Sequence, residues 1–280
     1  MESIIELVSI TNSDYHAEKE HVSASRLKTL KKSPLHFINY KAMAPRAEFT
    51  IGNVFECLIL EEDKFTEQFY IFDDRKVCQE IGGKNPRVTN KYRDWKAEAL
   101  KFAEGREIIN FEDYELVRNM LDQFDTNREA NRLLSAGTVQ PSIFFDYNGV
   151  KLKTRPDFVN QSGGVIVDIK TTSAEGPEGF QKQMANLNYH LQAVMQIEGA
   201  KQAGIDVQHY FYLVAEKNAP YCVNLYRLNE ETINFAYAEL DELTTLLKEC
   251  QQSNQWPGYE HRADNNHGIL NIGLPGWAIK

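Results

Sequence analysis

The sequence has 280 residues, of which 42% are hydrophobic, and it carries a formal net charge of −9 at pH 7. A chain of this length can bury a large core, and we expect a single catalytic domain over residues 1–280. The negative charge argues against a protein that coats nucleic acid through a basic surface. The four cysteines are scattered and form no CxxC pair, which argues against a disulfide framework and against a zinc or iron–sulfur site.

The N-terminus lacks the basic flank and the continuous apolar core of a signal peptide. No run of about 18 apolar residues occurs that would predict a membrane span. We therefore expect a cytoplasmic protein with no membrane association.

The first half of the chain has mainly helical patterns. Residues 23–43 predict two short helices separated by a Ser-Pro pair, and residues 52–61 predict a core helix. Residues 71–110 predict a loop followed by a helix from about residue 91, and residues 112–136 predict one or two more helices.

Two stretches of this acidic chain, residues 26–41 and 84–96, are strongly basic. Basic residues that line one groove are sufficient for DNA binding, but a solvated helix or loop face explains each stretch equally well.

After residue 140, β-branched and aromatic residues dominate short runs separated by turns, which predicts a meander of antiparallel strands followed by alternating helices and strands. The predicted elements are strands at residues 141–147, 150–159 and 165–172, a long helix at 178–203, strands at 208–217 and 221–228, and a helix from Asn229 to about residue 251. The sequence thus predicts an α/β fold with a mixed central sheet flanked by helices.

The residues with the strongest chemical signal lie in the string RPDFVNQSGGVIVDIKTT. Asp168 and Lys170 are two positions apart on a predicted strand, so their side chains project from the same face. Asp157 precedes the turn that leads into this strand, and counting back through the turn places it beside Asp168. Two carboxylates and an ammonium group are therefore expected in one small space.

Two neighbouring carboxylates repel each other unless a hard cation lies between them, and Mg²⁺ fits this arrangement. Lys170 beside a metal-bound water could orient the water, accept its proton or offset charge on a phosphoryl group. The alternative is an exposed ion pair, because a D-x-K pattern on a strand is common.

The P-D-x10-D-x-K pattern in a strand-turn-strand context resembles the PD-(D/E)XK nucleases. Further strings resemble the exonuclease VIII (RecE-type) branch of that superfamily. These are SASRLKTLKKSPLHF, GNVFECLILE, the Tyr189-His190-x-Gln192 pattern and WPGY near the C-terminus. The resemblance extends over residues 22–260 and implies a restriction-endonuclease-like core.

The resemblance implies an exonuclease that resects double-stranded DNA ends in the 5′ to 3′ direction and leaves a 3′ overhang for recombination. It also implies a homo-oligomeric ring, a trimer or a tetramer, and a single-strand annealing recombinase as partner. Such enzymes act in a bacterial cell or a phage-infected host.

The same resemblance implies a metal site with two Mg²⁺ ions, for which Mn²⁺ should substitute. The implied ligands are Asp157, Asp168, Glu56 and the backbone carbonyl of Ile169. Glu56 stands where the family usually has a histidine, and an exposed helix glutamate is the alternative reading of this residue. Glu61 is a weaker candidate for a supporting role.

Tyr189 and Gln192 share one face of the predicted long helix, with Gln196 one turn further along. The resemblance implies that this face closes over the site, where Gln192 binds the scissile phosphate or a metal-bound water. Core packing is the alternative role of Tyr189, and solvent exposure is the alternative for the glutamines. His190 points away from this face and is expected to be structural.

Four residues are candidates for DNA binding. Ser25 and Arg26 lie at a predicted helix N-terminus, where a terminal phosphate could bind, and Ser23 or Ser25 could instead be an ordinary N-cap. Arg155 beside the catalytic hairpin and Tyr189 are the other two candidates.

Two other functions remain open. The first is a PD-(D/E)XK endonuclease of a structure-specific or restriction-like kind, which the absence of an added specificity domain disfavours. The second is a noncatalytic nuclease-fold module that only binds DNA or a protein partner, which the presence of Asp157, Asp168 and Lys170 disfavours.

Overall fold

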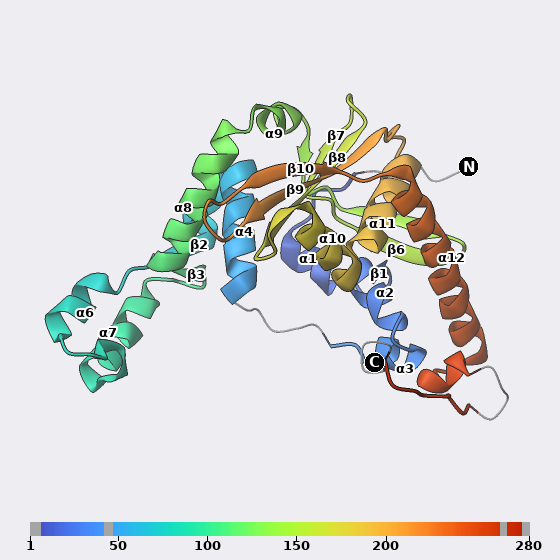
Figure 1. Ribbon diagram of the computed structural model, residues 1–280, viewed down its shortest axis with the longest axis horizontal. Coiled ribbons are helices and arrows are strands. Elements are labelled where there is room, and N and C mark those ends of the chain that lie inside the picture. The colour runs from blue at the N-terminus through green and yellow to red at the C-terminus, as the bar shows by residue number, and fades with distance from the viewer. Residues whose placement is uncertain (1–6, 42–46, 264–267, 276–280) are drawn as a thin grey trace.

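The computed structural model describes residues 7–41, 47–263 and 268–275 (Figure 1). The helices are α1 (Asn12–Ala17), α2 (Ala24–Leu30), α3 (Pro34–Ile38), α4 (Ala47–Leu60), α5 (Phe65–Gln68), α6 (Arg75–Ile81), α7 (Asn90–Lys101), α8 (Phe111–Thr126), α9 (Arg128–Leu133), α10 (Gly176–Leu187), α11 (Tyr189–Gln202) and α12 (Glu230–Ser253), with short 3-10 helices η1 (Glu62–Lys64), η2 (Pro86–Val88) and η3 (Tyr259–Arg262). The strands are β1 (Val22–Ser23), β2 (Phe69–Phe72), β3 (Glu107–Asn110), β4 (Thr138–Val139), β5 (Ile143–Tyr147), β6 (Val150–Thr154), β7 (Phe158–Asn160), β8 (Val165–Thr172), β9 (His209–Glu216) and β10 (Val223–Arg227).

The main sheet has five strands in the order β10-β9-β8-β7-β4. Strands β8 and β9 pair in parallel, and the other neighbours are antiparallel, so the sheet is mixed. A parallel pair needs a crossover connection, and α10 and α11 supply it between β8 and β9. A second sheet has the order β1-β6-β5, and β2 and β3 form a separate parallel pair. This arrangement confirms the predicted α/β fold with a mixed sheet flanked by helices.

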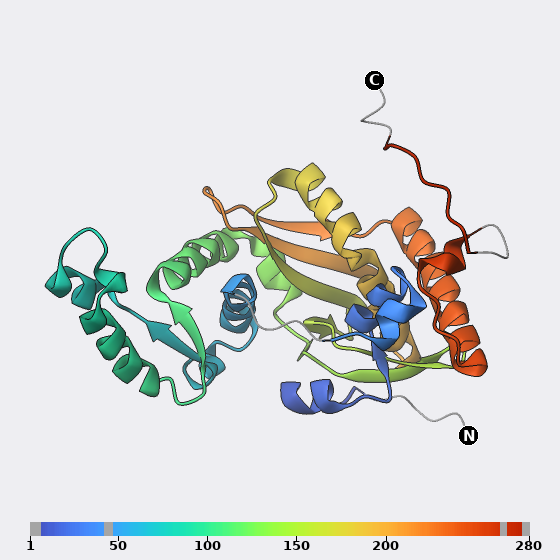
Figure 2. The same cartoon turned by 90° about the horizontal axis from the view of Figure 1, so that it is seen from below.

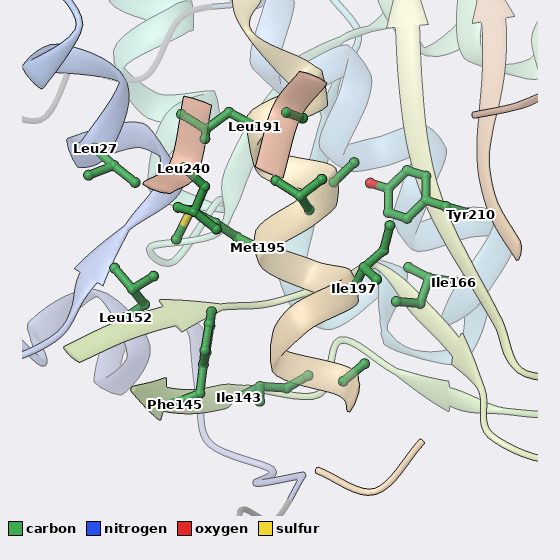
Figure 3. Close-up of a cluster of buried hydrophobic side chains, with 14 of the residues drawn as sticks. Leu27, Ile143, Phe145, Leu152, Ile166, Leu191, Met195, Ile197, Tyr210 and Leu240 are labelled. Carbon is green, nitrogen blue, oxygen red and sulfur yellow. The ribbon is translucent and has the colours of Figure 1, made fainter. Parts of the chain in front are cut away.

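Two hydrophobic clusters cover the two faces of the main sheet. Alternate residues of β8 enter different clusters, because successive strand side chains point to opposite faces. Ile166 joins the cluster around α11, whereas Val167 and Ile169 join the cluster that contains α4 and α8. Figure 3 shows α11 at the centre of the first cluster, where Leu191 and Met195 are fully buried. Each cluster therefore fixes one face of the strand that carries Asp168 and Lys170.

The predicted strand at residues 150–159 is two strands in different sheets, and the prediction of a single antiparallel meander is wrong. Strand β6 pairs with β5 and β1, whereas β7 pairs with β8 and β4. Between them lies Pro156, which has no backbone N–H to contribute to a ladder. The chain changes sheets at this point and bends at Asp157 before β7 begins.

The predicted long helix at residues 178–203 is also wrong in one respect, because it is broken into α10 and α11 at Asn188. Asn188 adopts a left-handed conformation with φ 52° and ψ 47°. Asparagine tolerates this region better than most residues, and one such residue ends α10 and redirects the chain. Gln192 and Tyr189 still share a helix, but that helix begins at Tyr189.

Residues 69–110 contain more structure than the predicted loop and helix. Strands β2 and β3 pair in parallel, and α6, η2 and α7 lie between them. In both views these helices project from the main sheet (Figures 1 and 2). The sequence did not predict β2 and β3, because a strand of four residues is too short to show the two-residue alternation of apolar and polar side chains.

The other predicted helices are present with modest shifts of their ends. The two predicted short helices are α2 and α3, while residues 42 and 43 of the predicted range lie outside the described residues. The N-cap of α2 is Ser23, whose side chain accepts a hydrogen bond from the Arg26 N–H. The core helix α4 ends at Leu60, and its Val54 and Phe55 are fully buried. Asn229 caps α12 as predicted.

Among the described helices, none combines the length and the apolar character needed to span a lipid bilayer.

Candidate active site

The hairpin of β7 and β8 brings Asp157 and Asp168 to the same place. Phe158 pairs with Val167, so the residue before β7 lies opposite Asp168. The Asp157 carboxylate accepts a hydrogen bond from the backbone N–H of Ile169, with an N to Oδ2 distance of 2.6 Å. The expected neighbourhood of the two carboxylates is therefore present.

Asp168 is fully buried, and polar groups surround its carboxylate. Its Oδ1 forms an ion pair with Nζ of Lys170. Its Oδ2 accepts hydrogen bonds from Nε2 of Gln192 at 2.9 Å and from Nε2 of Gln196 at 3.0 Å. This arrangement excludes the alternative of an exposed ion pair, because charge burial at this depth requires such partners.

Lys170 lies between the carboxylates and an aromatic ring. Its Nζ is 5.1 Å from the centroid of the Tyr189 ring. Burial lowers the pKa of Lys170, but the carboxylates of Asp168 and Asp157 outweigh burial and raise the pKa above its usual range. Lys170 is therefore a cation in this arrangement.

Glu56 reaches the same group from helix α4. Burial raises the pKa of its carboxyl, and the charge of Asp168 adds to this, while the Gln140 side chain and Lys170 oppose it. The pKa of Asp157 lies well above its usual range, because burial, Glu56 and Asp168 all raise it. The charge of Asp168 thus acts on the carboxyls of both Glu56 and Asp157, and the charge of Glu56 acts on Asp157.

The three carboxylates of Glu56, Asp157 and Asp168 form a set of hard oxygen donors suited to Mg²⁺ or Mn²⁺. Glu56, Asp157 and Asp168 therefore fit a divalent metal. Their carboxylates are not gathered as closely as ligands around an ion, because the three do not each place an oxygen within 4.8 Å of the others. Hydrogen bonds to Gln140, Ile169 and the two glutamines hold them instead.

A tighter group of possible ligands in the described part of the chain is Glu18, Glu20 and His21, whose ligand atoms lie within 4.8 Å of one another. Its carboxylates already have partners. Glu18 accepts from two backbone N–H groups and pairs with Lys153, and Glu20 pairs with Lys151. Two ammonium groups beside the carboxylates make this a weak cation site.

A cleft of about 1600 Å³ opens over the carboxylates. Glu56, Asp157, Gln192 and Gln196 line it, and Asp168, which accepts hydrogen bonds from both glutamines, is not part of its lining. The first turn of α2 contributes Ser23 to Arg26 to its wall.

The predicted DNA-binding residues have different positions. Ser25 is exposed and lines the cleft, but Ser23 is the N-cap. The guanidinium of Arg26 lies 4.6 Å from the centroid of the Phe37 ring and also lines the cleft. Arg155 donates to the carbonyl oxygens of Gln140 and Ile10, and its buried Nη1 has no hydrogen-bond partner among the described residues.

Glu61 and His190 lie outside the carboxylate group. Glu61 forms an ion pair with Lys64 at the rim of the cleft. His190 is buried, and its Nε2 lies 3.0 Å from Glu239, in agreement with the structural role expected for it.

The sequence did not predict Lys28, which lies on α2. Its Nζ is 5.5 Å from the centroid of the Tyr189 ring, so two lysines flank one tyrosine. Burial, and then the charge of Lys170, lower the pKa of Lys28 to about 8. Lys28 reaches the site only through the tertiary fold. In the sequence, its membership of the basic stretch at residues 26–41 was the only indication of a role in binding an anion.

Gln140 and Tyr210 are two further residues that sequence reasoning missed. Gln140 has a positive φ of 45°, its side chain donates to Glu56, and its backbone N–H donates to the Asp157 carbonyl oxygen at 2.9 Å. Tyr210 is buried on β9, and its hydroxyl donates to Oε1 of Gln196 at 2.8 Å. Strain at a non-glycine residue beside a site is common, but the sequence gives no signal for it.

The family model of a PDDEXK-like domain of unknown function (DUF3799) matches residues 23–266. No curated protein matches the sequence. The crystal structure of a "Putative exonuclease" from Eubacterium rectale is similar, with a TM-score of 0.60 and 12% identity over 97% of this chain and 98% of that chain. The structure of SSO0001 covers 73% of this chain and 88% of its own at 11% identity, with a TM-score of 0.27 that is too low to indicate a shared fold.

Proposed function

Because this chain belongs to the family of the PDDEXK-like domain of unknown function, we propose that it is a metal-dependent DNA nuclease that resects the ends of double-stranded DNA. The observation that supports this most directly is the group formed by Asp157, the fully buried Asp168 and Lys170, with Glu56 nearby, beside a cleft. Each of these groups has a use in phosphodiester hydrolysis.

Glu56, Asp157 and Asp168 would hold the metal, and the backbone carbonyl of Ile169 is a further candidate ligand. The divalent ion would supply Lewis-acid stabilisation of the phosphoryl oxygens and a water of lowered pKa. Magnesium is the proposed ion and manganese its substitute, with two ions per site as the family resemblance implies.

The side chains around the metal ligands position the reactants. Lys170 is cationic, which favours stabilisation of the negative charge that builds on the phosphoryl oxygens over removal of a proton from water. Gln192 lines the cleft, and its amide can donate to the scissile phosphate when a metal replaces its contact with Asp168. Gln196 accepts a hydrogen bond from the Tyr210 hydroxyl and donates one to Asp168, which fixes the orientation of the Asp168 carboxylate.

The hydrolysis itself requires one water and one phosphodiester. The water oxygen forms a new bond to phosphorus, and the bond from phosphorus to the O3′ of the neighbouring nucleotide breaks. The proton lost by water passes to solvent, and the leaving O3′ takes up a proton from solvent. No oxidant or further reactant is needed.

The finer parts of the proposal come from the resemblance of the sequence motifs to the exonuclease VIII branch. They are the 5′ to 3′ direction, the 3′ overhang, the ring-shaped homo-oligomer and the single-strand annealing partner. Ser25, Arg26, Arg155 and Tyr189 are proposed to contact the DNA, because three of them line the cleft and Tyr189 lies beside Lys170.

The test is digestion of a linear duplex and of a covalently closed circle of the same sequence, with Mg²⁺ and separately with Mn²⁺, following 5′- and 3′-labelled strands. We expect the linear duplex to shorten from its 5′ ends while the circle stays intact. Cutting of the circle would replace the exonuclease by an endonuclease. If neither substrate is cut with either ion, the protein is a binding module.

A further inference from the structure

Residues 69–110 form a projection that we call the arm, consisting of β2, α6, η2, α7 and β3. Figures 1 and 2 show α6 and α7 at the far end of the arm, away from the main sheet. The active-site residues do not include any part of the arm. Its role is therefore separate from the chemistry.

The end of the arm has a small core of its own. Phe72, Val77 and Tyr92 are buried there and lie outside both hydrophobic clusters of the main sheet. The buried carboxylate of Asp74 accepts from the Tyr92 hydroxyl at 2.6 Å and from Nε and Nη2 of Arg87 at 2.7 and 2.8 Å. These contacts fix η2 and α7 against α6, so the arm presents a defined surface.

The end of the arm is basic in an acidic protein, although the whole arm, residues 69–110, has nine basic and seven acidic residues and a net charge of +2. Residues 75–96 contain seven lysines and arginines and two acidic residues, a net charge of +5, while the whole chain has −9. The rest of the chain therefore carries −14. Lys76, Lys84 and Lys91 are exposed and form no ion pair within the described residues.

The charges around the start of α7 also favour an anion. Thr89 caps this helix of 12 residues, and its first turn contains no acidic residue but does contain Lys91 and Arg93. Cations at a helix N-terminus are unfavourable by themselves, because they lie beside the positive end of the helix dipole. A bound phosphate would reverse this, since it attracts the lysines and the free N–H groups together.

The arm begins at the wall of the active-site cleft. Gln68, Phe69 and Glu107, which lie at the base of β2 and β3, line the cleft together with Glu56 and Asp157. A long polyanion whose end lies in the cleft can pass this wall and continue beside the arm. The basic end of the arm is thus joined to the wall of the cleft through β2 and β3.

We propose that the arm binds the phosphate backbone of the duplex that leads to the active site. This inference rests on the proposed function, because it takes double-stranded DNA as the substrate. The end of the arm supplies positive charge for the part of the duplex outside the cleft, in addition to Arg26 and Arg155 in the cleft itself. It holds the duplex without reading its bases, since lysines that contact phosphates carry no sequence information.

The test compares two triple variants of equal charge. One replaces Lys76, Lys84 and Lys91 by Gln, and the control replaces Lys201, Lys217 and Lys248 by Gln, three lysines that do not line the cleft. Binding to duplexes of one and of four helical turns is measured by fluorescence anisotropy in EDTA over a salt series. We expect the arm variant to bind the long duplex about tenfold more weakly near physiological salt, with a salt slope that is smaller by about 0.9 for each lost phosphate contact. The control variant should match the wild type, and the short duplex should be affected little by either.

Several results would overturn the proposal. They are equal binding by the arm and control variants, an equal loss for both duplex lengths, or no binding of duplex by the wild type. Competition by polyglutamate as effective as that by DNA of equal charge would favour an acidic protein partner instead. If the wild type binds duplex through the arm but hydrolyses none with Mg²⁺ or Mn²⁺, the arm proposal stands and the nuclease proposal fails.

Discussion

At the scale of single residues, the two oxygens of the Asp168 carboxylate have different partners. Lys170 pairs with one oxygen, and the amides of Gln192 and Gln196 donate to the other. A divalent cation that binds Asp168 must compete with Lys170 for the carboxylate. Lys170 thus stabilises the buried charge before a metal binds and is available to the phosphate afterwards.

We predict that Lys170→Ala and Asp168→Asn each lower the rate of DNA hydrolysis about 1000-fold or more, because each removes a group that acts on the reacting phosphate. Asparagine keeps an oxygen that accepts from the glutamines, so the fold should survive. The measurement is single-turnover cleavage, with circular dichroism as the check on folding and Lys182→Ala on the exposed face of α10 as control. Full activity of Lys170→Ala would contradict the mechanism.

We predict that Lys28 gives substrate binding a pH dependence. Its folded-state pKa of about 8 is below the ordinary value for lysine, so the side chain loses its charge as the pH rises through 8. The KM for DNA should therefore rise above pH 8 in the wild type. In Lys28→Arg, whose guanidinium stays charged, this rise should vanish, and Lys28→Ala should raise KM about tenfold already at pH 7. A KM that depends on pH equally in the wild type and in Lys28→Arg would exclude this role.

The residues that the sequence predicted share one property, namely a local pattern. The i, i+2 spacing of Asp168 and Lys170 and the turn back to Asp157 define a hairpin without any knowledge of the rest of the fold. Lys28 and Gln140 come to the site from distant segments, and only packing of α2 and of the segment before β5 brings them there. Gln196 was recognised as sharing a face with Gln192, but nothing in the sequence indicated that Tyr210 would hold it in the core.

At the scale of elements, the break between α10 and α11 determines where the glutamines lie. Asn188 in its left-handed conformation turns the chain so that α11 can pack within the core, while its side chain accepts a hydrogen bond from Lys31. If α10 and α11 formed one continuous helix, Gln192 would not lie beside Asp168 on β8.

We predict that Asn188→Val lowers the free energy of unfolding by about 1–2 kcal/mol more than Asn188→Gly does. Both variants lose the hydrogen bond to Lys31, so their difference reports the conformational cost of a β-branched residue at positive φ. Chemical denaturation measures it. Equal stability of the two variants would indicate that the break moves to another residue.

The elements that the sequence missed are those that depend on partners. Strands β2 and β3 have four residues each and are strands because they pair with one another across more than 30 residues of chain. The sequence predicts β6 and β7 as one strand, because the alternation of apolar and polar residues continues through Pro156. The chain changes sheets at this point without any change in the hydrophobic pattern. Longer elements such as α8 and α12 were predictable, because their apolar stripe repeats several times.

At the scale of the whole molecule, the arm and the main sheet differ in how much apolar surface they bury. The fully buried residues of β8, β9 and α11 form large clusters, whereas the end of the arm relies on a few side chains and on Asp74. A region that buries less apolar surface unfolds locally at a lower free energy than a region with a large core.

We predict that backbone amides of α6 and α7 exchange hydrogen much faster than those of β8 and β9, because the end of the arm can unfold while the main sheet stays intact. Hydrogen exchange followed by mass spectrometry measures this. Asp74→Asn, which weakens the contact with Arg87, should speed exchange in the arm and leave β8 unchanged. Equal protection of the arm and the main sheet would show that they unfold as one unit.

The edges of the two larger sheets have a consequence for self-association. One edge of the main sheet is β4 and one edge of the second sheet is β1, and each of these strands has only two residues, whereas the opposite edges, β10 and β5, have five residues each. Long, flat edge strands expose rows of unpaired N–H and C=O groups that recruit strands from other molecules into aggregates, and very short ones do not. A second copy that docks at β4 or β1 must therefore do so through its side chains, and extension of either sheet by another strand is possible only at β10 or β5.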